Sequence, residues 1–302
     1  MRKEFSAAIE KISAKDESII FITGDLGYNA FECLQQSLGN RFINAGVAEQ
    51  NMVSVAAGMA SHGYKVFCYS IAPFIVYRCL EQFRNDVCMH NLPVFLVGNG
   101  GGYGYGIMGP THHALEDIGC MSSMQNVKCW VPSFNDEVEI VLKKIITEKK
   151  PTYLRLNNSQ NAPAGFSSAN CINSVIKSSN PKATIISTGP VINNVIKSLA
   201  NKNISGKCNL FSASYFPLEL SDEFILSVNS TNNLLVVEEH VSAGGLAQQL
   251  SLKLLENRLK INKFVSLHAR GYPNGLFGDQ HYHQEQSGID ADNISKVLTE
   301  MF

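Results

Sequence analysis

The sequence has 302 residues, of which 45% are hydrophobic, so it is long enough to bury a sizeable core in one large or two ordinary domains. Its net charge of -1 gives no reason to expect nucleic acid or an anionic membrane surface as a partner. No apolar run could span a membrane, no secretory signal is recognisable, and the eight cysteines form no C-x-x-C pair, so we expect a cytoplasmic protein with reduced thiols.

In the first half of the chain, short apolar segments alternate with segments of helical periodicity. We expect helices at 4–13, 47–62, 74–91 and 135–149, and strands at 18–25, 65–70, 93–99, 127–132 and 151–156. Strands that alternate with helices predict a parallel sheet covered by helices on both faces.

The composition changes at residues 157–181, which are rich in Asn and Ser and carry little charge, and we expect a linker there. The alternation then resumes, with expected strands at 183–189, 206–214, 233–240 and 263–269 and helices near 190–201, 220–228 and 244–260. The fold class that follows is α/β, with two three-layer α/β/α domains of mostly parallel sheet at 1–156 and 182–302.

A glycine-rich loop follows the predicted strand 93–99 and contains one G-x-G-x-x-G match, Gly104, Gly106 and Gly109. A dinucleotide fingerprint would lead directly into a helix, whereas this match leads into "PTHH", so we favour tight turns or a close backbone approach to a ligand. His112 and His113 follow, and adjacent side chains on an extended chain point to opposite sides. We therefore expect one of them to have a structural role and the other a role in the site.

Two further histidines, in "HYH" (281–283), would share one face if that segment is extended. No third ligand lies near them in the sequence, and we predict no metal site. The acidic pair in "EEH" (238–240) ends a predicted strand, where α/β proteins place ligands, but a solvated loop explains it equally well.

Glu49 heads the mostly small and apolar stretch 42–63. Two interpretations are open: an acid in the first turn of a helix, where the macrodipole favours negative charge, or a carboxyl group buried to hold or move a proton.

Five segments, in this order, resemble the transketolase and 1-deoxyxylulose-5-phosphate synthase family: "GDL" (24–26), "NAGVAEQNM" (44–52), "APFIVYRCLEQFRND" (72–86), "GPTHH" (109–113) and "VEEHVSAGG" (237–245). The resemblance covers essentially the whole chain, but only the C-terminal half of such an enzyme. It is closest to split transketolases, in which separate genes encode the two halves. It implies a domain at 1–156 that binds the pyrimidine ring of thiamine diphosphate, and a transketolase C-terminal domain at 182–302.

The resemblance also implies roles for the cofactor side of the site. Glu49 matches the acid that hydrogen-bonds to ring N1′ of the pyrimidine and supports the tautomer needed for catalysis. Phe74 and Tyr77 match aromatic residues that flank the ring, although a core aromatic stripe would have the same spacing. Asp25 matches an acid near the cofactor.

For the substrate, the resemblance implies that His112 contacts the sugar and that Arg155 and Arg2 bind a sugar phosphate. Three positions depart from the family. Met108 replaces an acid that contacts the donor, Gly100 replaces a histidine, and Asn29 stands at a phosphate-side serine position. These departures cast doubt on the ordinary pentose phosphates as substrates.

The implied function is therefore transfer of a two-carbon ketol unit between sugars or sugar derivatives. The G-D-G…N motif that binds diphosphate and Mg²⁺ is not recognisable, so we expect an N-terminal partner subunit to supply it. The expected assembly is a heterotetramer built on a homodimer core. The alternatives are the beta subunit of a 2-oxo-acid dehydrogenase and a non-catalytic scaffold paralogue.

Overall fold

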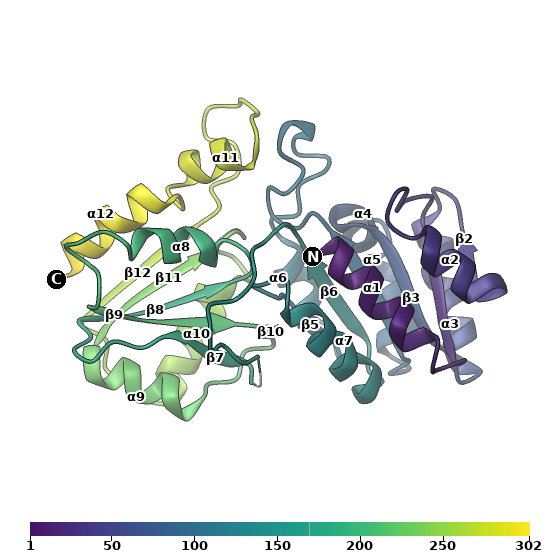
Figure 1. Cartoon of the computed structure of the whole chain (residues 1–302), viewed down its shortest axis with the longest axis horizontal. Coiled ribbons are helices and arrows are strands. Elements are labelled where there is room, and N and C mark those ends of the chain that lie inside the picture. Colours follow the sequence, from purple (N-terminus) through teal and green to yellow (C-terminus); the bar gives the residue numbers. More distant parts are fainter. Residues whose placement is uncertain (169) are drawn as a thin grey trace.

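The computed structural model describes residues 1–168 and 170–302. Within these residues the chain forms two mostly parallel sheets, side by side and each covered by helices on both faces (Figure 1). The strand order is β10-β5-β6-β4-β3-β1-β2 in the first sheet and β12-β11-β8-β9-β7 in the second. The predicted fold class, with two three-layer α/β/α units, is confirmed.

The strands are short and mostly buried. Those of the first sheet are β1 (Ile19–Thr23), β2 (Phe42–Asn44), β3 (Lys65–Ile71), β4 (Val94–Asn99), β5 (Lys128–Trp130), β6 (Thr152–Leu156) and β10 (Tyr215–Phe216). Those of the second are β7 (Ile172–Ile176), β8 (Ala183–Thr188), β9 (Cys208–Ala213), β11 (Asn233–Glu238) and β12 (Lys263–His268). β10 pairs antiparallel with β5, and so joins the first sheet although it comes from the second half of the chain.

The helices fill the connections between the strands. They are α1 (Arg2–Ser13), α2 (Glu32–Leu38), α3 (Glu49–Ser61), α4 (Ala72–Tyr77), α5 (Leu80–Gln82), α6 (Asp117–Ser122), α7 (Glu137–Glu148), α8 (Ile192–Ser198), α9 (Asp222–Thr231), α10 (Leu246–Glu256), α11 (Gln280–Ser287) and α12 (Ala291–Met301).

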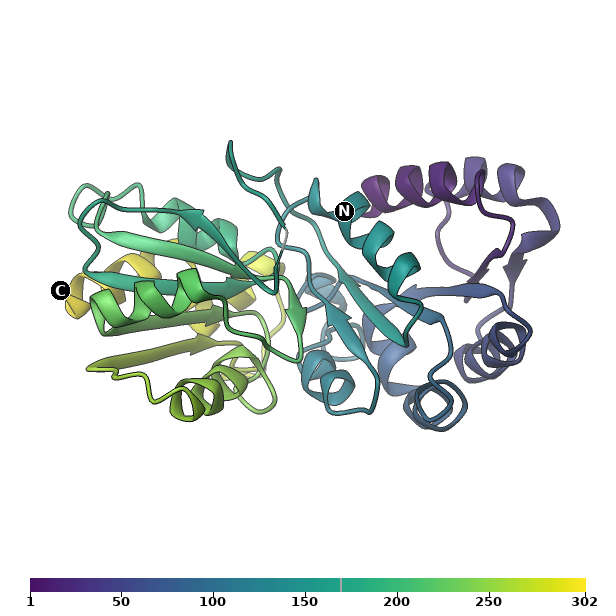
Figure 2. The same ribbon diagram turned by 90° about the horizontal axis from the view of Figure 1, so that it is seen from below.

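Successive residues of each central strand pack into opposite layers, as the pleat of a strand requires. In β1, Ile20 and Ile22 join the core beneath α3 and α4, whereas Ile19 and Phe21 join the core beneath α1, α2 and α7. Figure 2 shows these two layers edge-on, with α1 (purple) on one side of the first sheet and the blue helices on the other. Burial on both faces explains why these strands are apolar along their whole length.

The structure differs from the sequence expectations in three places. The segment 157–181, expected as a linker, contains β7, which pairs with β9. The segment "HYH" lies in α11 rather than in an extended chain, so its two histidines do not share a face. The helix expected at 74–91 is divided into α4, α5 and a π-helical segment, Phe83–Cys88.

The break between α4 and α5 lies at Cys79, whose φ of -119° and ψ of 24° fall outside the α-helical region and whose thiol donates to the carbonyl of Ile75. Arg78, the residue before it, keeps helical dihedral angles, and its side chain reaches Glu49 at the start of α3.

Candidate active site

The candidate site lies where parallel strands of the first sheet end, at the edge where open α/β sheets bind ligands. β1 is followed by Gly24 and Asp25, β3 ends with Ser70 and Ile71, and β4 is followed by Gly100. Glu49, the first residue of α3, points into this edge: an added Cβ on Gly24 would lie 3.5 Å from its Oε1 atom.

Glu49 is only 3% exposed and has two partners. The hydroxyl of Ser70 donates to Oε1 over 3.0 Å, and the guanidinium of Arg78 donates to Oε2 over 3.1 Å. An acidic residue whose only role in the first turn was to interact with the helix dipole would be expected to face solvent. The burial and the fixed partners instead favour the interpretation of a carboxyl group buried to hold or move a proton.

Arg78 also lies over the ring of Phe74, with its guanidinium carbon 3.8 Å from the ring centroid. A flat cationic group thus stacks on an aromatic face and bonds to Glu49 at the same time. The Arg78 side chain is 45% exposed, so it is free to turn into solvent. Phe74 and Glu49 consequently present the surface that a flat, nitrogen-rich heterocycle needs.

A line of rings continues from Phe74 away from Glu49. His112 packs edge-on against Phe74 with ring centroids 5.2 Å apart, and Tyr105 follows at 6.0 Å from His112. Tyr105 lines a groove, here called the Arg2 groove, together with Arg2, Lys3, Asn99, Gly100 and Asn158. Pairwise contacts therefore link Glu49 to Phe74 through Arg78, Phe74 to His112, and His112 to Tyr105 in the Arg2 groove.

Asp25 and Tyr77 have partners outside this series of contacts. Asp25 accepts hydrogen bonds from Asn44 and Tyr28, each over 2.9 Å, and the bond from Asn44 holds the pKa of Asp25 below its usual range. Tyr77 is partly exposed and its hydroxyl donates to Glu116 over 2.9 Å. Burial raises the pKa of Tyr77.

Asn29 and Met108 are exposed. Asn29 has a positive φ of 59°, and its backbone N–H donates to Glu32. Met108 is 53% exposed at the end of the short 3-10 turn Gly106–Met108.

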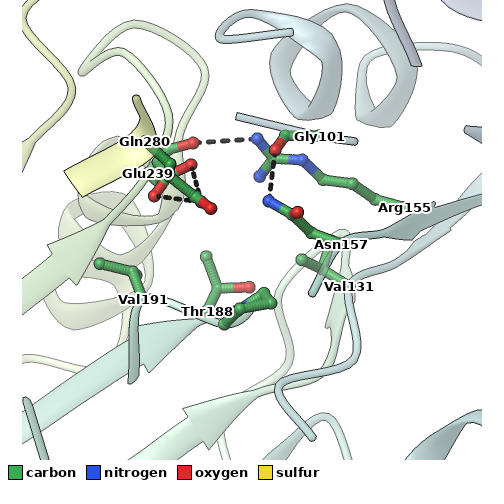
Figure 3. A pocket seen from close by; sticks show the side chains of 10 residues that line it. Gly101, Val131, Arg155, Asn157, Thr188, Val191, Glu239 and Gln280 are labelled. Carbon is green, nitrogen blue, oxygen red and sulfur yellow. Dashed lines mark hydrogen bonds between the residues drawn. The ribbon is translucent and has the colours of Figure 1, made fainter. Parts of the chain in front are cut away.

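Arg155 requires a correction. It lies almost fully buried between the two sheets, where Nε pairs with Asp117 over 3.0 Å and Nη2 donates to the carbonyls of Ala114 and Glu239, each over 2.9 Å. Figure 3 shows Arg155 beside Glu239. Because Nε and Nη2 already bond inside the protein and the side chain is buried, Arg155 joins the two halves rather than gripping a sugar phosphate. The motif "YLRL" could not reveal this, since its partner Asp117 is 38 positions away in the chain.

The acidic pair at the end of β11 is also internal, and the alternative of a solvated loop is wrong. Glu238 accepts from the first backbone N–H groups of α10, and burial raises its pKa to about 7. Glu239 accepts from the backbone of Tyr103 over 2.7 Å and from Gln280 and Gln284. The second half of the chain thus holds the glycine-rich loop in place.

The two adjacent histidines have different surroundings. His113 is 2% exposed, bonded to the hydroxyl of Tyr272 and the carbonyl of Gly106, and burial lowers its pKa to about 4. His283 stacks on Tyr103 with centroids 4.8 Å apart. His112, in contrast, faces Phe74 and the site.

Sequence reasoning misses three contributors: Ser70, Arg78 and Tyr105. Arg78 follows Phe74 by one helical turn, which is a detectable signal. Ser70 and Tyr105 reach the site only through strand pairing and loop closure, so no local pattern identifies them.

Among residues 1–168 and 170–302, no group of three or more His, Cys, Asp or Glu side chains is placed to hold a metal ion. Within the same residues, no helix combines the length and the apolar character needed to cross a membrane.

The fold, together with the site at the edge of the first sheet, indicates the class of protein to which the chain belongs. The chain belongs to the transketolase family, because residues 1–163 match the family described as "Transketolase, pyrimidine binding domain". It is 26% identical to one subunit of the apulose-4-phosphate transketolase of Phocaeicola vulgatus, over 99% of this chain and 96% of that protein.

Two other similarities place the chain relative to full-length enzymes. It is 25% identical to 1-deoxy-D-xylulose-5-phosphate synthase of Clostridium beijerinckii, over 99% of this chain but 49% of that protein, so it spans about half the length of this relative. Its fold matches a solved structure described as "Split gene transketolase, inactive beta4 tetramer", with a TM-score of 0.82, 22% identity, and coverage of 99% of this chain and 97% of that one.

Proposed function

We propose that this chain is the pyrimidine-binding, catalytic subunit of a split transketolase-like enzyme that uses thiamine diphosphate. The enzyme would transfer a two-carbon ketol unit between sugars or sugar derivatives. The observation that carries the proposal is Glu49, a buried carboxylate at the head of α3 beside the half-buried ring of Phe74.

The residues present fit the pyrimidine end of the cofactor. Arg78 already makes the two contacts that an aminopyrimidine would make, stacking on Phe74 and donating to Glu49. Like a guanidinium, a protonated aminopyrimidine is flat and donates N–H groups in its own plane, so it can take over both contacts when Arg78 turns outward.

When bound, thiamine diphosphate supplies a carbon nucleophile and an electron sink for breaking and forming carbon–carbon bonds. The chain contributes proton handling and orientation. Glu49 exchanges a proton with a ring nitrogen, Phe74 fixes the plane of the ring, and Ser70 holds the carboxylate at its required angle. His112, beyond Phe74, is positioned to hydrogen-bond to the sugar.

The proposal extends to the assembly. A partner subunit would hold the diphosphate and Mg²⁺, and two copies of each chain would form a heterotetramer around a homodimer core. The relative that is itself one subunit of a transketolase, and the structure of a split-gene transketolase, support a partner of this kind. Residues 1–156 would act as the pyrimidine-binding domain and residues 182–302 as the C-terminal domain.

The test combines this chain with a candidate diphosphate-binding transketolase subunit, thiamine diphosphate and Mg²⁺. Xylulose 5-phosphate and apulose 4-phosphate serve as donors, with ribose 5-phosphate as acceptor, and ketol transfer is followed by chromatography of the sugar products. Ketol transfer from any of these donors supports the proposal. Decarboxylation of 2-oxo acids without ketol transfer would instead identify a 2-oxo-acid dehydrogenase subunit and overturn it.

A further inference from the structure

Tyr105 fills the space beside Gly100, the position at which the family that the chain resembles carries a histidine. A Cβ on Gly100 would lie 2.2 Å from Cε2 and 2.3 Å from Cδ2 of Tyr105. Gly100 also has a positive φ of 74°, which disfavours any side chain. No side chain can therefore occupy position 100 while Tyr105 keeps its place, and the two residues form a matched pair.

The phenol of Tyr105 faces the Arg2 groove with its hydrogen free to donate. Asn99 donates from Nδ2 to the phenol oxygen over 3.1 Å, so that contact uses a lone pair and leaves the O–H for another acceptor. Tyr103, two residues earlier, points the other way: it is fully buried and its hydroxyl donates to the carbonyl of Gly271 over 3.0 Å.

Tyr105 is also the residue that connects His112 with the Arg2 groove. Its ring is 6.0 Å from that of His112, and it shares the groove with the cations Arg2 and Lys3 and with the carboxylate of Glu4, which pairs with the amino terminus. A sugar that reached from His112 to these cations would come close to the Tyr105 side chain.

We propose that Tyr105 is a specificity-determining residue that donates its phenolic hydrogen to an oxygen of the sugar substrate. Tyr105 would thereby take the place of the histidine that the family carries at the position of Gly100. The feature that Tyr105 would select is a hydroxyl or carbonyl oxygen of the sugar opposite its phenol. This inference rests on the proposed ketol transfer and names the residue that selects the sugar.

The main test is Tyr105→Phe in the assembled enzyme, which removes one hydroxyl and keeps the ring. We expect the KM of the sugar phosphate to rise about fivefold to tenfold, as for one neutral hydrogen bond, with little change in kcat or Tm. The matched control is Tyr103→Phe, which should lower Tm because its hydroxyl bonds are internal, while leaving KM unchanged. An unchanged KM in Tyr105→Phe would overturn the proposal.

A second experiment separates Tyr105 from the proposed function by measuring binding rather than turnover. Ribose 5-phosphate is titrated calorimetrically into the assembled wild-type and Tyr105→Phe enzymes. Equal affinity of the two would refute the role of Tyr105 and leave the proposed function intact. If wild type neither binds nor turns over any sugar phosphate, the proposed function itself fails and the Tyr105 inference with it.

The matched pair gives a third test. Gly100→His alone should lower Tm or abolish folding, because the new side chain collides with Tyr105. Gly100→His combined with Tyr105→Ala removes the collision but not the strain of the positive φ, so Tm should recover in part, and kcat/KM for xylulose 5-phosphate should rise above that of Tyr105→Ala. A double variant no better than Tyr105→Ala would contradict the exchange of roles.

Discussion

The guanidinium of Arg78, the residue that follows α4, lies 3.1 Å from the carboxylate of Glu49 at the start of α3. The contact fixes the orientation of the buried carboxylate, and Arg78, at 45% exposure, can release it to a competing donor.

Glu49→Gln should abolish most ketol transfer. The substitution keeps the shape of the side chain but removes its ability to exchange a proton, so we expect a loss of about a hundredfold or more in kcat with the partner present. Glu81→Gln, on the exposed side of α5, serves as the control and should retain activity. Near-normal turnover by Glu49→Gln would contradict the assigned role.

Met108→Asp should raise activity on ordinary ketose phosphates. Met108 is exposed, and at this position the family that the chain resembles carries an acid that contacts the donor. We expect wild type to use xylulose 5-phosphate poorly and the variant to use it better, measured as kcat/KM. Ile107→Asp, one residue earlier and 77% exposed, controls for added charge alone. Robust turnover of xylulose 5-phosphate by wild type would mean that the altered pocket does not exclude it.

The Arg155→Met variant should have a lower free energy of unfolding than wild type, and not only weaker sugar binding. Removing one partner of a buried ion pair leaves Asp117 uncompensated, at a cost of about 3–5 kcal/mol in unfolding free energy. Denaturant unfolding measures this, with Arg2→Met as an exposed control that should keep wild-type stability. If Arg155→Met keeps full stability and only KM rises, Arg155 is a substrate ligand after all.

His113 should make the fold sensitive to acid. Its folded pKa is lowered by burial from 6.5 to about 4, so its contribution to stability is complete above pH 6.5 and is lost as the pH falls toward 4. The difference amounts to about 2 kcal/mol at pH 5. Unfolding free energies at pH 7.5 and pH 5 should therefore differ more in wild type than in His113→Gln. An equal pH dependence of the two proteins would show that His113 is not held neutral.

This chain alone should bind thiamine diphosphate weakly. Most of the charge of the cofactor lies at its diphosphate, and the described residues offer a pyrimidine surface but no cluster of acidic ligands for Mg²⁺. Calorimetric titration of thiamine diphosphate and Mg²⁺ is compared for this chain alone and for its mixture with the partner subunit. Tight binding and full turnover by the single chain would refute the divided site.

The sequence predicts the fold well because nearly every central strand is apolar throughout and nearly every covering helix keeps a 3.6-residue period. The strand expected at 65–70, for example, is β3 (Lys65–Ile71), and the helix expected at 135–149 is α7 (Glu137–Glu148). The failures have two causes. β7 (INSVI) is short and lies within a polar segment, and it gains its structure by pairing with β9, whereas "HYH" is helical because Asp279 caps the start of α11.

The residues of the candidate site likewise fall into two groups, those that the sequence identifies and those that it does not. Glu49, Phe74 and His112 belong to contiguous motifs and can be identified in the sequence. Arg155 and Tyr105 cannot be assigned correctly from local patterns, because their roles depend on residues distant in the chain or on a loop that folds back. Tyr105 meets Gly100 only because the glycine-rich loop turns, and that loop is held by Glu239, more than 130 residues away.

The pairing of β10 with β5 has a consequence for handling the protein in pieces. Tyr215 and Phe216 cover Trp130 and Cys129 at what would otherwise be the open edge of the first sheet. A bare edge with such apolar residues is a template for strand addition by another chain, and therefore for aggregation. The edge of the first sheet is thus covered by β10, a strand from the second half of the chain. A fragment that ends before β10 should therefore aggregate rather than fold, even though it contains the whole core of the first sheet.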